Sequence, residues 1–213
     1  MLRNEIKVTK TAHYYTFNAD KNIDTILYVF HGYAQLASIF ITEFDYLKES
    51  NVLVIAPEGL SLFYGRERTP VSSWMTSHER EDEIQDQIEY LNNLHLRIKS
   101  QFPDKKLVML GFSQGVSALM RWLNQLNEKN VELHLCCGSI PPEIIRNELI
   151  STKINEAYYY YGSNDRLMKR NQAESALLKM KELSINHTYI PFIGIHEVPN
   201  ETHKNLEKLN KGK

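Results

Sequence analysis

The sequence predicts an α/β fold, with a mostly parallel central sheet and helices on both faces. Short apolar runs of the kind that form buried strands alternate with amphipathic segments of helical periodicity. The apolar runs are nearly continuous, which is typical of parallel strands covered on both faces. No repeat, low-complexity tract or linker interrupts this alternation. We therefore expect a single domain over residues 1–213.

The strand predictions follow the order of the chain. Ile6–Thr9 and Tyr14–Phe17 alternate in polarity, which favours an exposed antiparallel hairpin at a sheet edge. Continuous apolar runs then predict six buried strands, at Thr25–Phe30, Asn51–Ala56, Leu107–Leu110, Leu133–Cys137, Ala157–Tyr161 and Thr188–Phe192.

Helical patterns fill the segments between these strands. The longest, Glu79–Gln101, places apolar residues on one face and acids and amides on the other. Helices are predicted at Ser38–Lys48, Glu79–Gln101, Gln114–Asn127, Lys169–Leu183 and Glu201–Leu209.

Composition excludes several classes of function. The formal net charge of -1 gives no electrostatic basis for binding nucleic acid. No apolar run reaches the length of an integral membrane segment, and the N-terminus lacks a signal-peptide core. Cys136 and Cys137 are adjacent, so on a strand they point to opposite faces and form neither a disulfide nor a zinc site. We expect a cytoplasmic monomer or homodimer without metal or cofactor.

The segment Gly111-Phe112-Ser113-Gln114-Gly115 fits the pattern G-x-S-x-G between a predicted strand and a predicted helix. A sharp turn here forces the serine toward positive φ and lifts its hydroxyl above the sheet edge. The alternative is a chance Gly/Ser turn. The flanking strand and helix favour a nucleophilic Ser113.

A serine nucleophile needs a histidine base and an acid to orient it. Asp165 follows the Ala157–Tyr161 strand, although aspartate at a turn is commonly only a turn former or helix cap. Glu143 and Glu148 are the reserve candidates. His196 follows the last strand and completes the order Ser, Asp, His.

The other C-terminal histidines are expected to play no part in the site. His187 begins the last strand and belongs at the opposite rim, and His203 is expected to face solvent from the last helix. The oxyanion formed on attack needs donors, which we assign to the backbone N–H groups of Tyr33 and Gln114. His31 is interpreted as structural, packed beneath the loop that carries Tyr33.

The connection over residues 58–78 is apolar yet lacks strand or helix periodicity. Long loops of this kind often cover a binding site. Phe63, Trp74 and Met75 are therefore candidate substrate-binding residues. The alternative is that Trp74 only plugs the fold.

The motifs Phe-His-Gly-Tyr, Gly-Phe-Ser-Gln-Gly, Gly-Ser-Asn-Asp and Gly-Ile-His occur in this order. With them the chain resembles the α/β-hydrolase superfamily, and within it the phospholipase/carboxylesterase/acyl-protein thioesterase branch. The resemblance implies a triad of Ser113, Asp165 and His196. That branch commonly has H-G-L-G-D where this chain reads His-Gly-Tyr-Ala-Gln, so the substrate is left open.

The sequence thus favours a serine hydrolase that cleaves a small-molecule carboxylic ester through an acyl-enzyme. An acyl thioesterase or lysophospholipase would use the same triad. A non-catalytic ligand-binding protein and a cofactor-free lyase or haloperoxidase are alternatives on the same scaffold.

Overall fold

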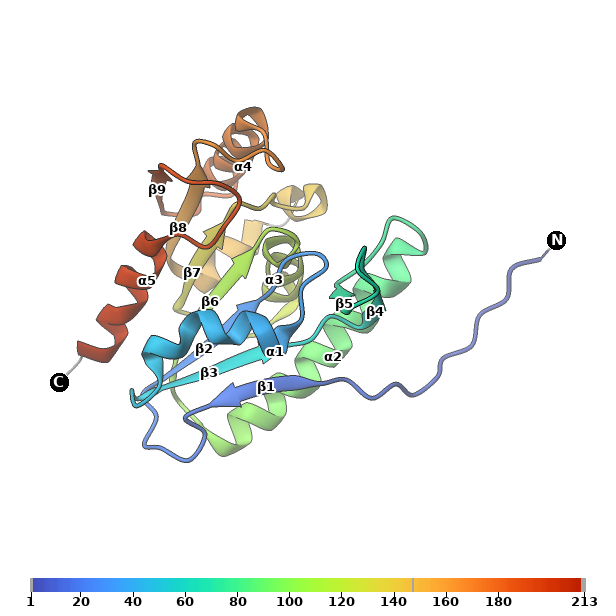
Figure 1. The fold of residues 1–213 in the computed structure, drawn as a ribbon, viewed down its shortest axis with the longest axis horizontal. Coiled ribbons are helices and arrows are strands. Elements are labelled where there is room, and N and C mark those ends of the chain that lie inside the picture. Colours follow the sequence, from blue (N-terminus) through green and yellow to red (C-terminus); the bar gives the residue numbers. More distant parts are fainter. Residues whose placement is uncertain (1, 147, 212–213) are drawn as a thin grey trace.

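The computed structural model describes residues 2–146 and 148–211. Within them, a seven-stranded sheet has the order β1-β3-β2-β6-β7-β8-β9 (Figure 1). Neighbouring strands from β3 to β9 are parallel, whereas β1 runs antiparallel to β3. The bounds are Tyr14–Phe17 (β1), Thr25–Phe30 (β2), Val52–Pro57 (β3), Lys106–Phe112 (β6), Val131–Cys136 (β7), Ile154–Gly162 (β8) and His187–Phe192 (β9).

The antiparallel edge is confirmed, but the predicted hairpin partner is wrong. β1 pairs with β3, with Tyr14 opposite Pro57 and Phe17 opposite Val54. Residues 6–9 form no strand, and the chain before β1 extends away from the sheet (Figure 1). Pairing with β3 lets Phe17 pack against the core, a gain that a hairpin with residues 6–9 would not provide.

The helices lie at the predicted segments, except that the predicted helix Ser38–Lys48 is α-helical only at its start and continues as a 3₁₀ helix. They are α1 (Ala37–Phe40), α2 (Arg80–Gln101), α3 (Gln114–Gln125), α4 (Arg170–Glu182) and α5 (Asn200–Glu207). Single 3₁₀ turns or short 3₁₀ helices cover Ile41–Leu47, Pro142–Arg146, Glu148–Lys153 and Lys208–Lys211.

Two hydrophobic clusters lie on opposite faces of the sheet. One contains Leu91 of α2, Leu119 of α3 and Met180 of α4. The other contains Phe40 of α1 and Leu206 of α5. Burial on both faces explains why the central strands are continuously apolar, since neither face of β2 or β3 meets water.

The connection over residues 58–78, expected to lack strands, contains a small antiparallel hairpin. It is formed by β4 (Ser61–Tyr64) and β5 (Pro70–Ser73). An isolated bridge between Gln35 and Ser72 joins this hairpin to the loop after β2. The hairpin is thereby fixed beside the carboxyl ends of the parallel strands.

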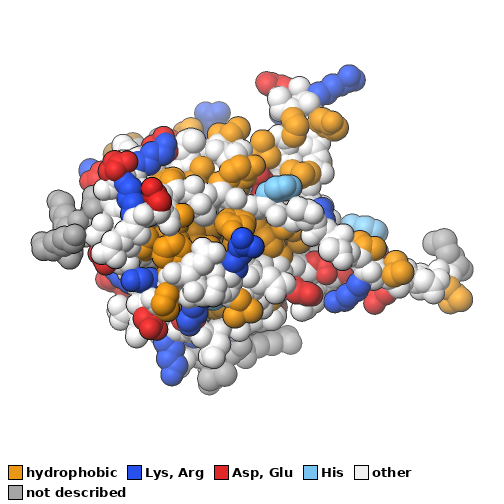
Figure 2. Space-filling model, turned by 90° about the horizontal axis from the view of Figure 1, so that it is seen from below, with side chains coloured by type: hydrophobic (Ala, Val, Ile, Leu, Met, Phe, Trp, Pro, Cys, Tyr) orange, Lys and Arg blue, Asp and Glu red, His pale blue; other side chains and the backbone are white. Residues whose placement is uncertain are grey.

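The surface carries charges of both signs. On the face seen in Figure 2, basic and acidic side chains are interspersed around a central group of hydrophobic ones. In the described part of the chain, no helix combines the length and the hydrophobicity that crossing a membrane requires.

Candidate active site

Ser113 lies on the tight turn between β6 and α3, as predicted. Its φ of 54° and ψ of -117° fall in a strained region for a residue with a side chain. The Ser113 N–H donates to the carbonyl oxygen of Cys136 at 2.9 Å, which ties the turn to β7. The serine is half-buried at the carboxyl end of the sheet, where ligands bind in parallel α/β folds.

Gly115 makes this turn sterically possible. A Cβ atom at position 115 would lie 2.2 Å from the carbonyl oxygen of Phe30 and 2.6 Å from that of His31. Both carbonyls are backbone groups of β2 and its following loop, and they cannot move aside without disturbing the sheet. A side chain at position 115 would therefore push α3 and Ser113 away from β2.

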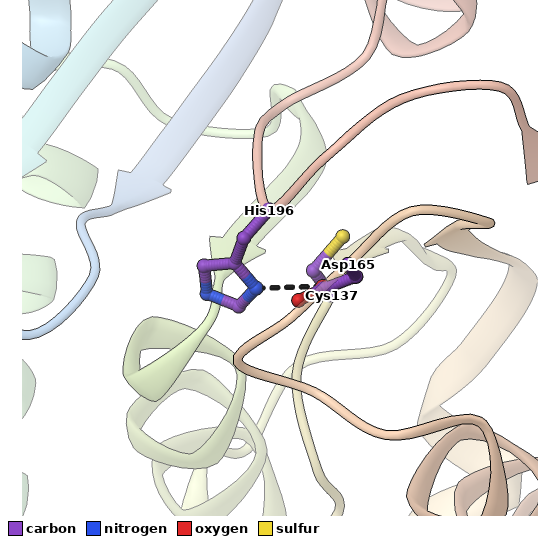
Figure 3. A group of neighbouring side chains, drawn as sticks. All are labelled: Cys137, Asp165 and His196. Atoms are coloured by element: carbon purple, nitrogen blue, oxygen red, sulfur yellow. Dashed lines mark hydrogen bonds and ion pairs between the residues drawn. The ribbon is translucent and has the colours of Figure 1, made fainter.

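His196 follows β9 and reaches back to the serine turn. The Ser113 hydroxyl donates to Nε2 of His196 at 2.8 Å, and Nδ1–H of His196 donates to Oδ2 of Asp165 at 2.7 Å. Figure 3 shows the histidine ring directed toward the carboxylate. The carboxylate fixes the proton on Nδ1, so Nε2 is left free to accept the serine proton.

Asp165 is both a turn former and the partner of His196. Its Oδ1 atom accepts the backbone N–H groups of Leu167 and Met168, each at 2.8 Å. Its Oδ2 atom faces the imidazole, and the carboxylate is 0% exposed. The two interpretations of this residue are therefore compatible, because each uses a different oxygen.

The loops that carry Asp165 and His196 are joined through their backbones. The N–H of Asn164 donates to the carbonyl oxygen of Gly194 at 2.9 Å. At position 162 a Cβ atom would lie 2.4 Å from the carbonyl oxygen of Ile195, so Gly162 permits this approach. Main-chain contacts thus hold the loop of Asp165 against the loop of His196.

Of the two reserve acids, Glu143 does not reach the histidine. Glu143 instead pairs with Arg121 and Arg80, at 2.7 Å in each case. The side chain of Glu148 lies outside the described residues. His187 begins β9 at the opposite rim, as predicted.

His203 does not face solvent as expected. Its ring packs edge-on against Tyr46, with centroids 5.1 Å apart, and also contacts Phe44. Burial lowers the pKa of His203. The prediction was wrong because the 3₁₀ helix Ile41–Leu47 covers this face of α5. Local periodicity cannot reveal a contact between segments so far apart in the chain.

The two proposed oxyanion donors lie at the expected positions in the chain. Gln114 is the first residue of α3, so its N–H has no acceptor one turn earlier in the helix. The N–H of Tyr33 donates to no acceptor within the described residues, whereas its neighbours Gly32 and Ala34 donate to Gln35 and Ser72. Both N–H groups therefore remain available to a ligand.

The Gln114 side chain has a second role that the sequence did not suggest. Its Nε2 donates to the carbonyl oxygen of Met75 at 2.9 Å, and its Oε1 accepts the N–H of Trp74 at 3.1 Å. The residue after Ser113 thereby holds the segment after β5 in place. No local pattern indicates a contact between positions 40 residues apart.

Cys137 lies next to Asp165 and His196. Its Sγ and the nearest ligand atoms of Asp165 and His196 are within 4.8 Å of one another, close enough to consider a metal site (Figure 3). Burial raises the pKa of the Cys137 thiol to about 12, and the nearby Asp165 charge adds to this. Metals bind the thiolate, and the His196–Asp165 hydrogen bond already uses both partners. These groups fit a proton-transfer site better than a metal site.

Of the three candidate substrate-binding residues, Trp74 is a core residue. It is 1% exposed, its ring stacks on His31, and its Nε1–H donates to the His31 carbonyl oxygen at 2.8 Å. These contacts support a structural role for Trp74 in the core and argue against contact with the substrate. Phe63 and Met75 are half-buried, and the Phe63 ring lies 5.4 Å from that of Tyr33.

Trp74→Ala and Phe63→Ala are expected to have opposite effects. Removing the buried indole leaves a cavity and should lower the free energy of unfolding by about 3–5 kcal/mol. Removing the half-buried Phe63 ring beside Tyr33 should instead change the preference for acyl length and leave stability nearly unchanged. Denaturant unfolding and kcat/KM over a series of p-nitrophenyl esters measure the two effects. A stable Trp74→Ala variant with an altered preference for acyl length would contradict the assignment of Trp74 to the core.

Comparison with known proteins identifies the family of this chain. The family model described as Serine hydrolase (FSH1) matches residues 23–207. The chain belongs to this serine hydrolase family. The match spans every element from β2 to α5, and so includes all the residues placed in the site above. A search of curated protein sequences found no match.

Solved structures of esterases and thioesterases share the fold of this serine hydrolase. Esterase PE8 has a TM-score of 0.73 at 16% identity, over 94% of this chain and 100% of its own. The Bacillus cereus carboxylesterase has a TM-score of 0.73 at 14% identity, covering 94% and 93%. The Zea mays acyl-protein thioesterase 2 has a TM-score of 0.67 at 14% identity, covering 94% and 99%. The resemblance to esterase- and thioesterase-like α/β hydrolases is confirmed.

Proposed function

We propose that this serine hydrolase cleaves carboxylic esters through an acyl-enzyme intermediate. Ser113 Oγ attacks the ester carbonyl while His196 Nε2 takes its proton. The imidazolium, stabilised by Asp165, then protonates the departing alcohol, and the acyl group stays on Ser113. Water activated by the same imidazole attacks the acyl-enzyme and releases the carboxylic acid.

The observation that carries the proposal is the hydrogen-bond chain from Ser113 through His196 to Asp165, with links of 2.8 and 2.7 Å. The available N–H groups of Tyr33 and Gln114 support it, because the tetrahedral intermediate needs donors for its oxyanion. One such donor is typically worth about 10²–10³ in kcat. A binding protein without turnover would have no need for this complete set.

An acyl thioester is the second candidate substrate. The same residues would attack it, and one of the structures that share the fold is an acyl-protein thioesterase. A lysophospholipase would also use this site. The candidates differ in the acyl and leaving-group pockets, for which Phe63 and Met75 are our proposed lining residues.

A panel of p-nitrophenyl esters and matched thioesters of graded acyl length tests the proposal. We expect steady ester hydrolysis preceded by a burst of one p-nitrophenol per active site, because deacylation by water is the slower step for activated esters. The kcat/KM values then rank chain length and compare ester with thioester. Stoichiometric ligand binding without turnover on every substrate would instead indicate a non-catalytic protein.

We also propose that the protein works in a reducing compartment such as the cytoplasm. Cys136 and Cys137 are both free and buried. Burial raises the pKa of the Cys136 thiol as well, so both thiols stay protonated and act as small hydrophobic side chains.

A further inference from the structure

The peptide unit between Gly32 and Tyr33 has two polar groups with different partners. Its carbonyl oxygen, on Gly32, accepts Nδ1–H of His31 at 2.7 Å. Its N–H, on Tyr33, is the proposed oxyanion donor. In a trans peptide these two groups lie in one plane and point in opposite directions. A group that fixes the carbonyl therefore also aims the N–H.

His31 is held so that it can only be a donor at Nδ1. Its Nε2 accepts the backbone N–H of Gly59 at 3.1 Å, and a backbone N–H cannot accept in return. Nε2 is therefore unprotonated and Nδ1 carries the proton. The ring is 0% exposed and stacks on Trp74, with centroids 4.8 Å apart. Burial lowers the pKa of His31, which keeps this neutral form at neutral pH.

A buried carboxylate fixes the surroundings of the imidazole. Glu58 accepts the Ser72 hydroxyl at 2.5 Å and the N–H of Ala37 at 3.1 Å. Ser72 Oγ lies 3.1 Å from Nε2 of His31. The backbone of Ser72 also accepts the N–H of Ala34 at 2.9 Å. β5 and Glu58 thus hold the loop on both sides of the Gly32–Tyr33 peptide.

We propose that His31 is a positioning residue for catalysis, which aims the Tyr33 N–H at the oxyanion by holding the Gly32 carbonyl. This inference rests on the proposed function. Without the imidazole, the carbonyl loses its buried donor and the peptide plane is free to rotate away. An oxyanion donor bonds more strongly to the negative charge of the transition state than to the neutral ester carbonyl, so we expect the loss to fall mainly on kcat.

His31→Phe tests this, because it keeps a ring stacked on Trp74 but has no donor. We expect kcat per active site for a p-nitrophenyl ester to fall about 10–100-fold, with KM within about twofold. Active sites are counted by the endpoint of fluorophosphonate labelling. Affinity for a trifluoromethyl ketone, which forms an oxyanion adduct, should fall by a similar factor. His31→Leu carries the same expectation and replaces the Phe variant if that variant does not fold.

His31→Asn is the matched control, since its side-chain amide can donate to the Gly32 carbonyl from nearly the same place. It should recover most of the lost kcat. Two outcomes would overturn this inference and leave the proposed function standing. One is a His31→Phe variant with unchanged kcat per site, and the other is a folded His31→Asn variant as slow as His31→Phe. A wild-type chain that neither turns over esters nor takes the fluorophosphonate would overturn the proposed function as well.

Discussion

Ser113→Ala is expected to keep the fold and to lose roughly three or more decades of esterase kcat. Alanine keeps the Cβ atom, so the strained turn and the N–H bond to Cys136 are retained. The change removes only the oxygen that bonds to His196. The residual rate would come from the oxyanion donors and from substrate binding. Steady-state kinetics and thermal unfolding of the same preparation measure both quantities.

Covalent labelling makes this prediction specific. A fluorophosphonate should add once to the wild type and not to Ser113→Ala, as read by intact mass. Ser117→Ala is the matched control, because Ser117 lies one helical turn further along α3 and donates to the Ser139 carbonyl instead. It should label and turn over normally. A label on another residue of Ser113→Ala would refute the nucleophile assignment.

His196→Ala should approach the Ser113→Ala defect, and Asp165→Asn should cost somewhat less. The imidazole transfers the proton, whereas Asp165 fixes its tautomer and stabilises the imidazolium, an effect of up to about 10⁴ in kcat. Either change combined with Ser113→Ala should cost little more, because the three residues act as one unit.

Two other histidines serve as controls for this second prediction. His187→Ala should stay near wild-type activity, since His187 lies at the opposite rim of the sheet. His203→Ala should lower the melting temperature, because the ring packs on Tyr46, but should keep kcat per active site. If His203→Ala were inactive and His196→Ala active, the assignment of the general base to His196 would be wrong.

The positions of Ser113, Asp165 and His196 were predictable because one rule covers them all. Parallel strands bring their carboxyl ends to a single edge, so residues that follow three apolar runs meet there whatever their separation in sequence. The last glycine of the G-x-S-x-G pattern, Gly115, stands where the structure leaves no room for a side chain.

The errors occurred where the outcome depends on partners far away in the chain. Alternating polarity in residues 6–9 indicates a strand, but it cannot show that β3 offers Phe17 a better edge. The apolar character of Trp74 fits a covering loop and a buried plug equally well. Its burial depends on contact with His31, across more than 40 positions, which no local pattern contains.

Ser113 and His196 follow strands with very different support. β6 precedes Ser113 and is paired on both sides, with β2 and β7. β9 precedes His196, and in the described sheet it is paired only with β8 and is largely half-buried or exposed. Edge strands exchange their amide hydrogens through local opening that leaves the rest of the sheet intact. We therefore expect local opening of β9 to displace His196 while the turn at Ser113 stays folded, so that activity is lost at a lower denaturant concentration than the fold.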